Sequence, residues 1–189
     1  MKSVRLLFLL MLLLEGCATE TAGLPPPKPL GHAFLVERGR TLAPFAHVAF
    51  CMKAPFECKN NGGSSVVTMT ASNTATLESV NNAVNSAIVP REDPARVGTW
   101  QVNPFAGDCN DYAVSKRSEL IQAGMPARAL RLAVAKTPSG IGHTVLVVRT
   151  TLGDVVLDNR NYQLKRWDRT DLTWLKIESG ANPQLWYNL

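Results

Sequence analysis

The stretch "PFAGDCNDYAVSKRSELIQAG" (residues 104–124) changes character part-way along its length. Its first part places turn-forming residues and two carboxylates around one cysteine, and its second part has the apolar spacing of a helix that ends at Gly124. Asp108 fits the N-cap of this helix, and Asp111 fits its third position, which is the arrangement of a capping box. The sequence therefore predicts a helix whose first turn contains Cys109.

The start of a helix is a favourable place for a reactive cysteine. The first N–H groups of a helix have no partner within it, and the helix dipole favours negative charge there. A thiolate at that position is stabilised, and the same N–H groups can bind the oxyanion of a tetrahedral intermediate. Cys109 is therefore a candidate nucleophile for acyl transfer.

Downstream of this helix, apolar residues recur at every second position, which is typical of strands. A three-residue connection, "TLG", is short enough to join the last two strands as a hairpin with a loop centred on residues 152–153. The predicted strands are residues 128–135, 142–150 and 154–159.

Upstream of the cysteine motif, the sequence predicts one helix over residues 74–89, which Pro90 ends. Two short strands are predicted at residues 47–53 and 66–70. Together these elements predict an α+β fold in which helices pack on one side of an antiparallel sheet.

A thiolate nucleophile requires a base and a group that orients the base. Of the three histidines, His32 lies in a proline-rich segment and His47 near the expected domain edge, where surface or packing roles are favoured. His143 opens an apolar strand, where an imidazole is costly without a partner. Asp158 closes the next strand. When a hairpin loop has an even number of residues, side chains on the two strands share a face if their residue numbers have an odd sum, as 143 and 158 do. Cys109, His143 and Asp158 are thus a candidate triad, with a buried cysteine and a structural histidine as the alternative.

The N-terminus has the pattern of an export signal. Residues 1–16 combine two basic residues with a nine-residue apolar run that is too short to span a bilayer. "LEGC", which ends at Cys17, resembles a bacterial lipobox in which the cysteine is lipidated, although Glu15 is unusual there. Cleavage after Ala18 is the alternative. Both routes predict a chain outside the cytoplasm, in the periplasm, either free or held by a lipid anchor.

The remaining composition is that of a globular protein with a short stalk. Three consecutive prolines favour extended polyproline II, so residues 17–40 are predicted as a stalk and residues 41–189 as one domain. The net charge of +5 becomes +4 once Lys2, Arg5 and Glu15 are removed with the signal. No cluster of Lys and Arg stands out, so nucleic acid is not an expected partner.

Export also changes what the cysteines are expected to do. Cys51 and Cys58 enclose only six residues, and an oxidising compartment favours a disulfide between them. Two unpaired thiols are the alternative, and zinc is less favoured because no second Cys or His pair follows at ligand spacing. If Cys17 carries lipid, Cys109 is the one thiol left over.

Three segments, "GDCNDYAVSKRSELIQAG", "GHTVLVV" and "GDVVLDN", occur in an order that resembles the bacterial transglutaminase-like cysteine proteinases. The resemblance runs from about Phe45 to Trp174 and includes a similar closely spaced cysteine pair. It implies a papain-like, transglutaminase-type core with Cys109 as nucleophile, His143 as general base and then acid, and Asp158 as the orienting group. It also implies an exported protease with a protein substrate in the cell envelope, such as a surface adhesin, and an inner-membrane regulatory receptor.

The chain departs from the family pattern directly after the cysteine, where Asn110 replaces the usual Glu. In calcium-dependent members, acidic residues flanking the cysteine bind the ion, and the matching positions here are Asp108, Asn110 and Asp111. Losing a carboxylate weakens a calcium site, although an amide oxygen can still bind the ion. Helix capping explains the same residues at least as well. No cofactor is expected to be required, and calcium is the ion that the resemblance suggests.

The resemblance leaves two further points open. Trp100 is a candidate second oxyanion donor through its indole N–H, and packing beneath the loop is the alternative. The triad by itself does not separate an endopeptidase from a transglutaminase or amidase, in which an amine resolves the thioester. A non-catalytic envelope lipoprotein that binds other molecules is the third alternative.

Overall fold

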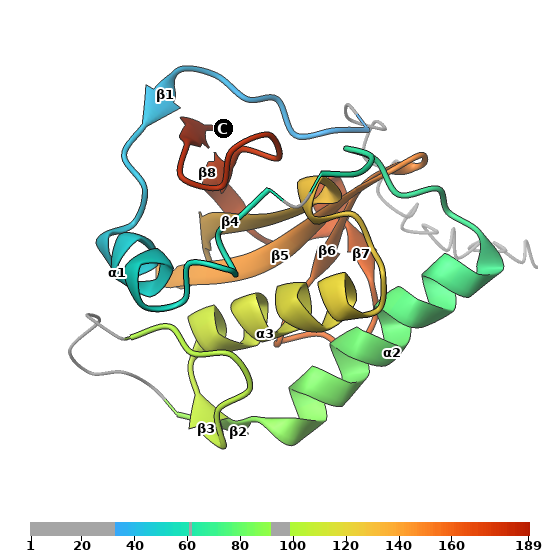
Figure 1. Cartoon of the computed structure of the whole chain (residues 1–189), viewed down its shortest axis with the longest axis horizontal. Helices are drawn as coiled ribbons and strands as arrows, with labels where there is room; N and C mark the ends of the chain where they lie inside the picture. Colours follow the sequence, from blue (N-terminus) through green and yellow to red (C-terminus); the bar gives the residue numbers. More distant parts are fainter. Residues whose placement is uncertain (1–32, 61, 92–98) are drawn as a thin grey trace, which may run out of the picture.

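The computed structural model describes residues 33–60, 62–91 and 99–189. The predicted signal peptide, Cys17, His32 and the proline-rich run lie outside these residues. Seven strands form one antiparallel sheet in the order β1-β9-β8-β4-β5-β6-β7. Figure 1 shows α3 lying between this sheet and α2. Within the described residues, no helix has the length and apolar character needed to cross a membrane.

The elements have the following bounds. The helices are α1 (Phe45–Lys53), α2 (Ala71–Ala87) and α3 (Cys109–Gln122), and short 3-10 turns occur at Ala127–Ala129 and Trp167–Arg169. The main sheet contains β1 (Arg40–Thr41), β4 (Leu130–Lys136), β5 (Gly142–Thr150), β6 (Gly153–Leu157), β7 (Lys165–Arg166), β8 (Thr173–Glu178) and β9 (Trp186–Asn188). A separate parallel pair consists of β2 (Val89–Pro90) and β3 (Ala106–Gly107).

The predicted α+β fold is confirmed. One hydrophobic cluster lies between the sheet and the helices and contains Phe50, Leu77 and Leu120. The opposite face of the sheet packs against residues such as Leu35 and Leu172. Leu35 is buried on this face, and its N–H donates to the Asp154 carboxylate at 2.8 Å.

The β5–β6 hairpin has the predicted parity but a different centre. Thr150 pairs with Gly153, so the loop consists of Thr151 and Leu152 and lies one residue earlier than expected. Leu146 pairs with Leu157, which preserves the odd sum of paired residue numbers. Gly153 has a φ of +115°, and a Cβ there would lie 2.5 Å from a backbone oxygen, so glycine is required.

Two predicted strands are wrong. Residues 47–53 belong to helix α1, whose buried His47 and Phe50 lie on one helical face after Pro44. A short apolar run does not distinguish a helix from a strand, because both can bury it. Residues 66–70 form only one bridge, in which Val67 pairs with Thr150.

The two longer helices follow their local signals. Thr70 caps α2 by accepting a hydrogen bond from Asn73 N–H at 3.1 Å, so this helix begins three residues before its predicted start. In α3, the predicted C-terminal signal is confirmed: Gly124 has a φ of +87°, and Met125 N–H bonds back to the Leu120 carbonyl. α3 is buried around most of its circumference because the sheet and α2 cover opposite sides of it.

Candidate active site

Cys109 occupies the first position of α3, as the sequence predicted. Asp108 is the N-cap and accepts a hydrogen bond from Asn110 N–H at 2.9 Å. The carboxylate of Asp111 accepts a hydrogen bond from Asp108 N–H at 3.0 Å, which completes the capping box. A Cβ on Gly107 would lie 2.3 Å from the Asp111 carboxylate, so only glycine allows this close turn. The cap therefore fixes where the helix begins and where the sulfur lies.

The fold brings Cys109, His143 and Asp158 together. His143, near the start of β5, places Nε2 at 2.8 Å from the Asp158 Oδ1, and both side chains are buried. The half-buried Cys109 sulfur lies close enough to the same imidazole to raise its pKa. Because Nε2 is already paired with Asp158, Nδ1 is the ring nitrogen left to accept a proton from the sulfur. Thr144 N–H also points to the Cys109 sulfur at 3.5 Å.

The electrostatics of this arrangement favour a charged imidazole. Burial by itself lowers the pKa of His143, but hydrogen bonds to Asp158 and Cys109, together with their charges, outweigh burial and raise it to about 9. Burial also raises the pKa of Asp158, yet the hydrogen bond and charge of His143 and the N–H of Arg160 bring it below its ordinary value. An imidazolium between a carboxylate and a sulfur is therefore the favoured state at neutral pH.

The sequence model of one protein family, the bacterial transglutaminase-like cysteine proteinases, matches residues 37–189. The chain belongs to this family. It is therefore a cysteine peptidase of the transglutaminase-like kind.

Solved structures are similar to this proteinase over much of its length. LapG of Legionella pneumophila in a calcium-bound form matches with a TM-score of 0.53 and 25% identity, covering 60% of this chain and 67% of that one. An EGTA-treated LapG structure matches with a TM-score of 0.50 and 25% identity, covering 61% and 67%. Among curated proteins, none matched the chain. The structural likeness supports the transglutaminase-type core.

Trp100 of this proteinase packs in the core. Its side chain is buried, and its ring lies edge-on to His47 with centroids 5.4 Å apart and 6.1 Å from the ring of Phe50. The next residue, Gln101, donates its N–H to the Asp111 carboxylate at 2.8 Å and so ties this segment to the cysteine motif. These contacts support the packing role, and the role of Trp100 as oxyanion donor stays a prediction.

The three residues considered for calcium are arranged as a cap. Every side-chain oxygen of Asp108 and Asp111 accepts a hydrogen bond from a neighbouring N–H group, and Asn110 Oδ1 accepts one from Thr144 at 2.7 Å. Burial raises the pKa of Asp111, although hydrogen bonds from Gln101 and Asp108 oppose it. As arranged, these side chains do not form an open oxygen cage of the kind that calcium requires.

The sequence analysis missed three buried polar residues behind Asp158. Asn81 and Asn85 lie on α2, and Lys116 lies on α3 two helical turns after Cys109. Asn85 donates a hydrogen bond to the Asp158 carbonyl, and Lys116 interacts electrostatically with the Asp158 carboxylate. Their signal was present in the sequence: each is a polar residue on the apolar face of a predicted helix.

Lys116→Met is expected to make the proteinase more stable below neutral pH. The Lys116 side chain is 0% exposed, and its Nζ has no hydrogen-bond partner among the described residues. Burial lowers the pKa of Lys116 from 10.5 to about 7, with the charge of Asp158 opposing it. Protonation of Lys116 thus favours the unfolded chain. It lowers the free energy of unfolding by about 5 kcal/mol, with the full effect below pH 7 and none above about pH 10.5.

Methionine has a similar length and no charge, so urea unfolding should show a gain for Lys116→Met at pH 6 that shrinks towards pH 10. The exposed Lys53 at the end of α1 provides the control, because Lys53→Met should change stability by less than about 1 kcal/mol. A Lys116→Met protein that is less stable than the parent at both pH values would contradict this account.

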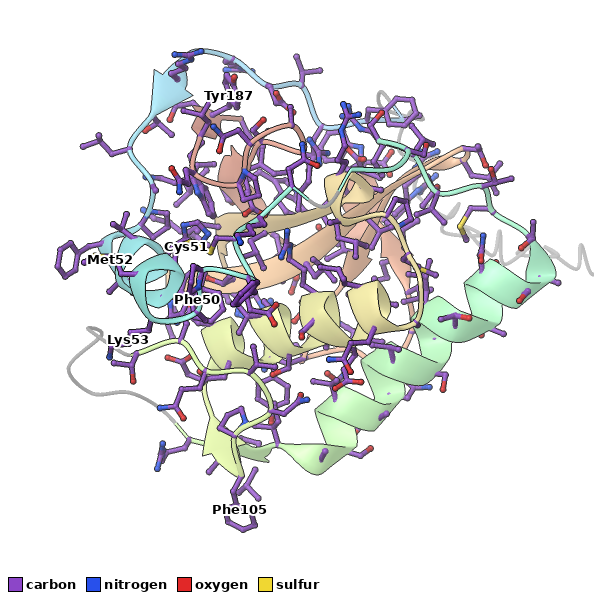
Figure 2. The ribbon with its side chains drawn as sticks, in the orientation of Figure 1. Phe50, Cys51, Met52, Lys53, Phe105 and Tyr187 are labelled. Atoms are coloured by element: carbon purple, nitrogen blue, oxygen red, sulfur yellow. A yellow bond between two sulfur atoms is a disulfide. The ribbon has the colours of Figure 1, made fainter. Side chains whose placement is uncertain are left out.

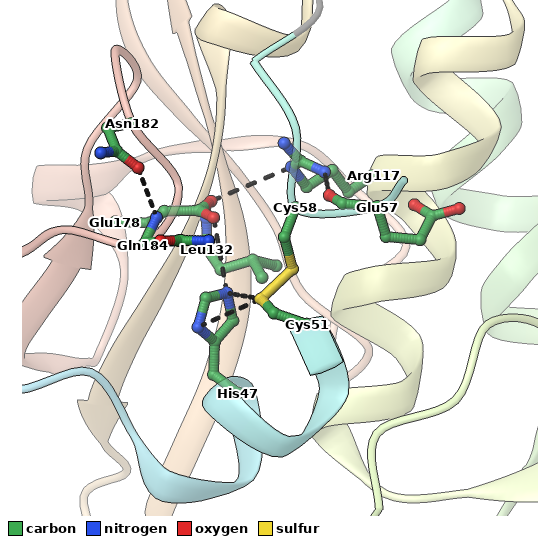
Figure 3. Close-up of a disulfide and its surroundings, with 9 residues drawn as sticks. All are labelled: His47, Cys51, Glu57, Cys58, Arg117, Leu132, Glu178, Asn182 and Gln184. Carbon is green, nitrogen blue, oxygen red and sulfur yellow. Dashed lines mark hydrogen bonds and ion pairs between the residues drawn. A yellow bond between two sulfur atoms is a disulfide. The ribbon is translucent and has the colours of Figure 1, made fainter. Parts of the chain in front are cut away.

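The predicted disulfide between Cys51 and Cys58 is present in the structure and lies beside a buried ionic cluster (Figure 3). His47 contacts the sulfur of Cys51 at 3.6 Å, and its Nε2 lies 3.5 Å from the Glu178 carboxylate. Glu178 also lies 3.9 Å from Arg117 on α3. The cluster therefore connects α1, β8 and the helix that carries Cys109. Both cysteine sulfurs are bonded to each other, so these residues serve as a structural staple.

An apolar hollow of about 540 Å³ lies between α2 and residues 103–105. Val84 and Ile88 line one side of it, and Phe105, which is 85% exposed and projects outward in Figure 2, lines the other. None of the three triad residues lines this hollow, so it is separate from the catalytic groups.

Proposed function

We propose that this proteinase is an exported thiol endopeptidase that cleaves a protein of the cell envelope through an acyl-enzyme on Cys109. The observation that carries the proposal is the convergence of three groups: Asp158 is bonded to His143 at 2.8 Å, and the sulfur of Cys109, at the first position of α3, interacts with the same imidazole. It supplies the nucleophile, the base and the orienting carboxylate that acyl transfer requires.

The chemistry follows from the positions of the three groups. His143 Nδ1 accepts the thiol proton, and the sulfur of Cys109 attacks the peptide carbonyl carbon. The oxygen that becomes negative can be stabilised by the N–H of Cys109 itself at the start of α3, because the N–H groups that follow it donate to Asp108. His143 then protonates the leaving amine, which departs and leaves a thioester. Water that gives its proton to His143 attacks the thioester, releases the acid and restores the thiol.

The location and partners of the enzyme are part of the proposal. The apolar run that precedes Cys17 supports export, and the "LEGC" segment supports a lipid anchor in the periplasm. Family resemblance supports a surface adhesin as the substrate and an inner-membrane receptor as the regulator.

The test is a mass-spectrometric comparison of envelope proteins from cells with the intact enzyme and cells with Cys109→Ala, each with and without a labelled primary amine. We expect new N-termini in one or a few proteins that depend on Cys109. Label attached to glutamine side chains instead would identify the same triad as that of a transglutaminase. Identical protein sets, combined with iodoacetamide labelling of Cys109 no faster than an ordinary thiol, would indicate a non-catalytic binding protein.

The rate of Cys109 acylation is expected to fall at alkaline pH. There the imidazolium of His143, whose pKa is about 9, loses the proton that the leaving group needs. Turnover of a small peptide substrate between about pH 4 and about pH 10 measures this alkaline limb. A flat profile across this range would contradict the ion pair, and Cys109→Ala provides the background.

Calcium is expected to have little effect on the wild-type enzyme. Asp108 and Asp111 hold the helix cap, and Asn110 supplies no charge. Asn110→Glu adds the missing carboxylate, so calcium should raise the melting temperature of this variant relative to EGTA, whereas Asn110→Gln, of the same length but uncharged, should not respond. Loss of wild-type activity or stability in EGTA would show that the cap binds calcium despite its hydrogen bonds.

A further inference from the structure

Two buried amides connect α2 to the turn that carries Asp158. Asn81 and Asn85 are one helical turn apart and are 0% and 9% exposed. Asn85 Nδ2 lies 3.2 Å from the Asp158 carbonyl oxygen and 3.2 Å from that of Asn161. Asn81 Nδ2 lies 3.0 Å from the carbonyl oxygens of Asn161 and Tyr162. Each amide nitrogen carries two hydrogens, so each can make both of its bonds.

The same turn positions the carboxylate that contacts the base. Asp158 Oδ1 accepts a hydrogen bond from Arg160 N–H at 2.9 Å as well as the bond from His143 at 2.8 Å. Asn161 N–H closes the turn on the Asp158 carbonyl at 3.1 Å. A rotation of this turn would therefore move Oδ1 away from the imidazole. Asn85 opposes such a rotation because it is bonded to the Asp158 carbonyl at the start of the turn.

Stability alone does not explain why amides occupy these positions. Asn81 and Asn85 share the buried face of α2 with Leu77 and Val84, where leucine has a higher helix propensity and buries no polar group. The Oδ1 atoms of both amides are buried without a hydrogen-bond partner among the described residues. A buried polar group kept at such a cost is typical of a site where position matters more than stability.

We propose that Asn85 is a positioning residue of the catalytic site, whose amide fixes the Asp158 turn so that Oδ1 stays on His143. The inference rests on the proposed triad and gives α2 a part in the reaction that acts through the position of Asp158. Asn81 holds the distal half of the turn, at Asn161 and Tyr162, and does not bond to Asp158 itself. This difference makes Asn81 a matched control on the same helix.

The test uses p-nitrophenyl acetate, whose acetyl group passes to the sulfur of Cys109 as p-nitrophenolate leaves, and then to water. Asn85→Leu should lower the rates of acylation and deacylation by about 10- to 100-fold with little change in KM, because the base is displaced from its working geometry. Asn81→Leu should remain within about threefold of the parent. Near-UV circular dichroism and the melting temperature check that both variants are folded, and Asn85→Ala replaces Asn85→Leu if leucine prevents folding.

Combining Asn85→Leu with Asp158→Asn distinguishes positioning from a general structural effect. If Asn85 acts through Asp158, Asn85→Leu should lower the rate no further in the Asp158→Asn background. Equal losses for Asn81→Leu and Asn85→Leu, a full additional loss in that background, or a folded Asn85 variant with parental rates would each overturn the inference. If Asp158→Asn itself were harmless, the proposed triad would be wrong, which is a separate outcome.

Discussion

Cys109→Ala is expected to lower peptide cleavage by at least about 10⁴-fold, to the level of the buffer reaction. In the proposed mechanism the sulfur of Cys109 forms the thioester, and Cys109 is the one cysteine of the described residues outside the disulfide. Removing it leaves the helix cap intact, because the cap depends on Asp108 and Asp111. Cleavage of a small peptide substrate, or the burst of p-nitrophenol from p-nitrophenyl acetate, measures the loss.

The double variant Cys51→Ser/Cys58→Ser is the matched control for the removal of sulfur. These residues staple α1 beside the His47–Glu178 cluster and lie outside the triad. The control should retain catalysis per folded molecule while losing roughly 2–3 kcal/mol of stability. A Cys109→Ala protein that retains a Cys109-like burst, or a disulfide variant that loses catalysis while folded, would contradict the assignment of the nucleophile.

Asp158→Asn is expected to lower the rate by about 10³- to 10⁴-fold while the protein remains folded. An amide has nearly the same shape as the carboxylate, but it cannot stabilise an imidazolium by charge. Because the Asp158 bond and charge help to raise the pKa of His143 to about 9, their loss moves that pKa downward. The alkaline limb of the pH–rate profile should therefore move to lower pH along with the fall in rate.

Asp171→Asn makes the same chemical change outside the triad. Asp171 pairs with Arg160 at the surface, so its variant should keep a rate within about threefold of the parent and leave the alkaline limb in place. If Asp171→Asn lowered the rate as much as Asp158→Asn, the loss would be due to a change in the turn around Arg160 and not to the Asp158 carboxylate itself. An Asp158→Asn enzyme with the parental rate would rule out the carboxylate as the orienting group.

The elements of the active site that were predicted correctly have local causes. The cap of α3 depends on residues within three positions of one another, Asp108 and Asp111, and its end depends on Gly124. Likewise, alternation and loop length within one hairpin set which face His143 and Asp158 share. The family resemblance rests on the order of three such motifs along the chain. Such signals can be read from sequence because the interacting residues are close along the chain.

The errors and omissions have a different physical origin. Residues 47–53 became helix α1 because their burial depends on β8 and α3, which lie far away in sequence. The roles of Asn85 and Lys116 depend on a turn more than 40 residues downstream of either helix position, and a polar residue in a helix has no local mark of such a partner.

By itself, the sequence determined that Cys109 begins a capped helix and that His143 and Asp158 share a face of one hairpin, because short-range hydrogen bonds and side-chain alternation decide both. Only the tertiary structure decided that the sulfur of Cys109 lies beside the imidazole of His143 and that Asn85 of α2 bonds to the Asp158 carbonyl. The reason is that these contacts form when separate elements pack together, and packing depends on the shape and burial of the whole fold.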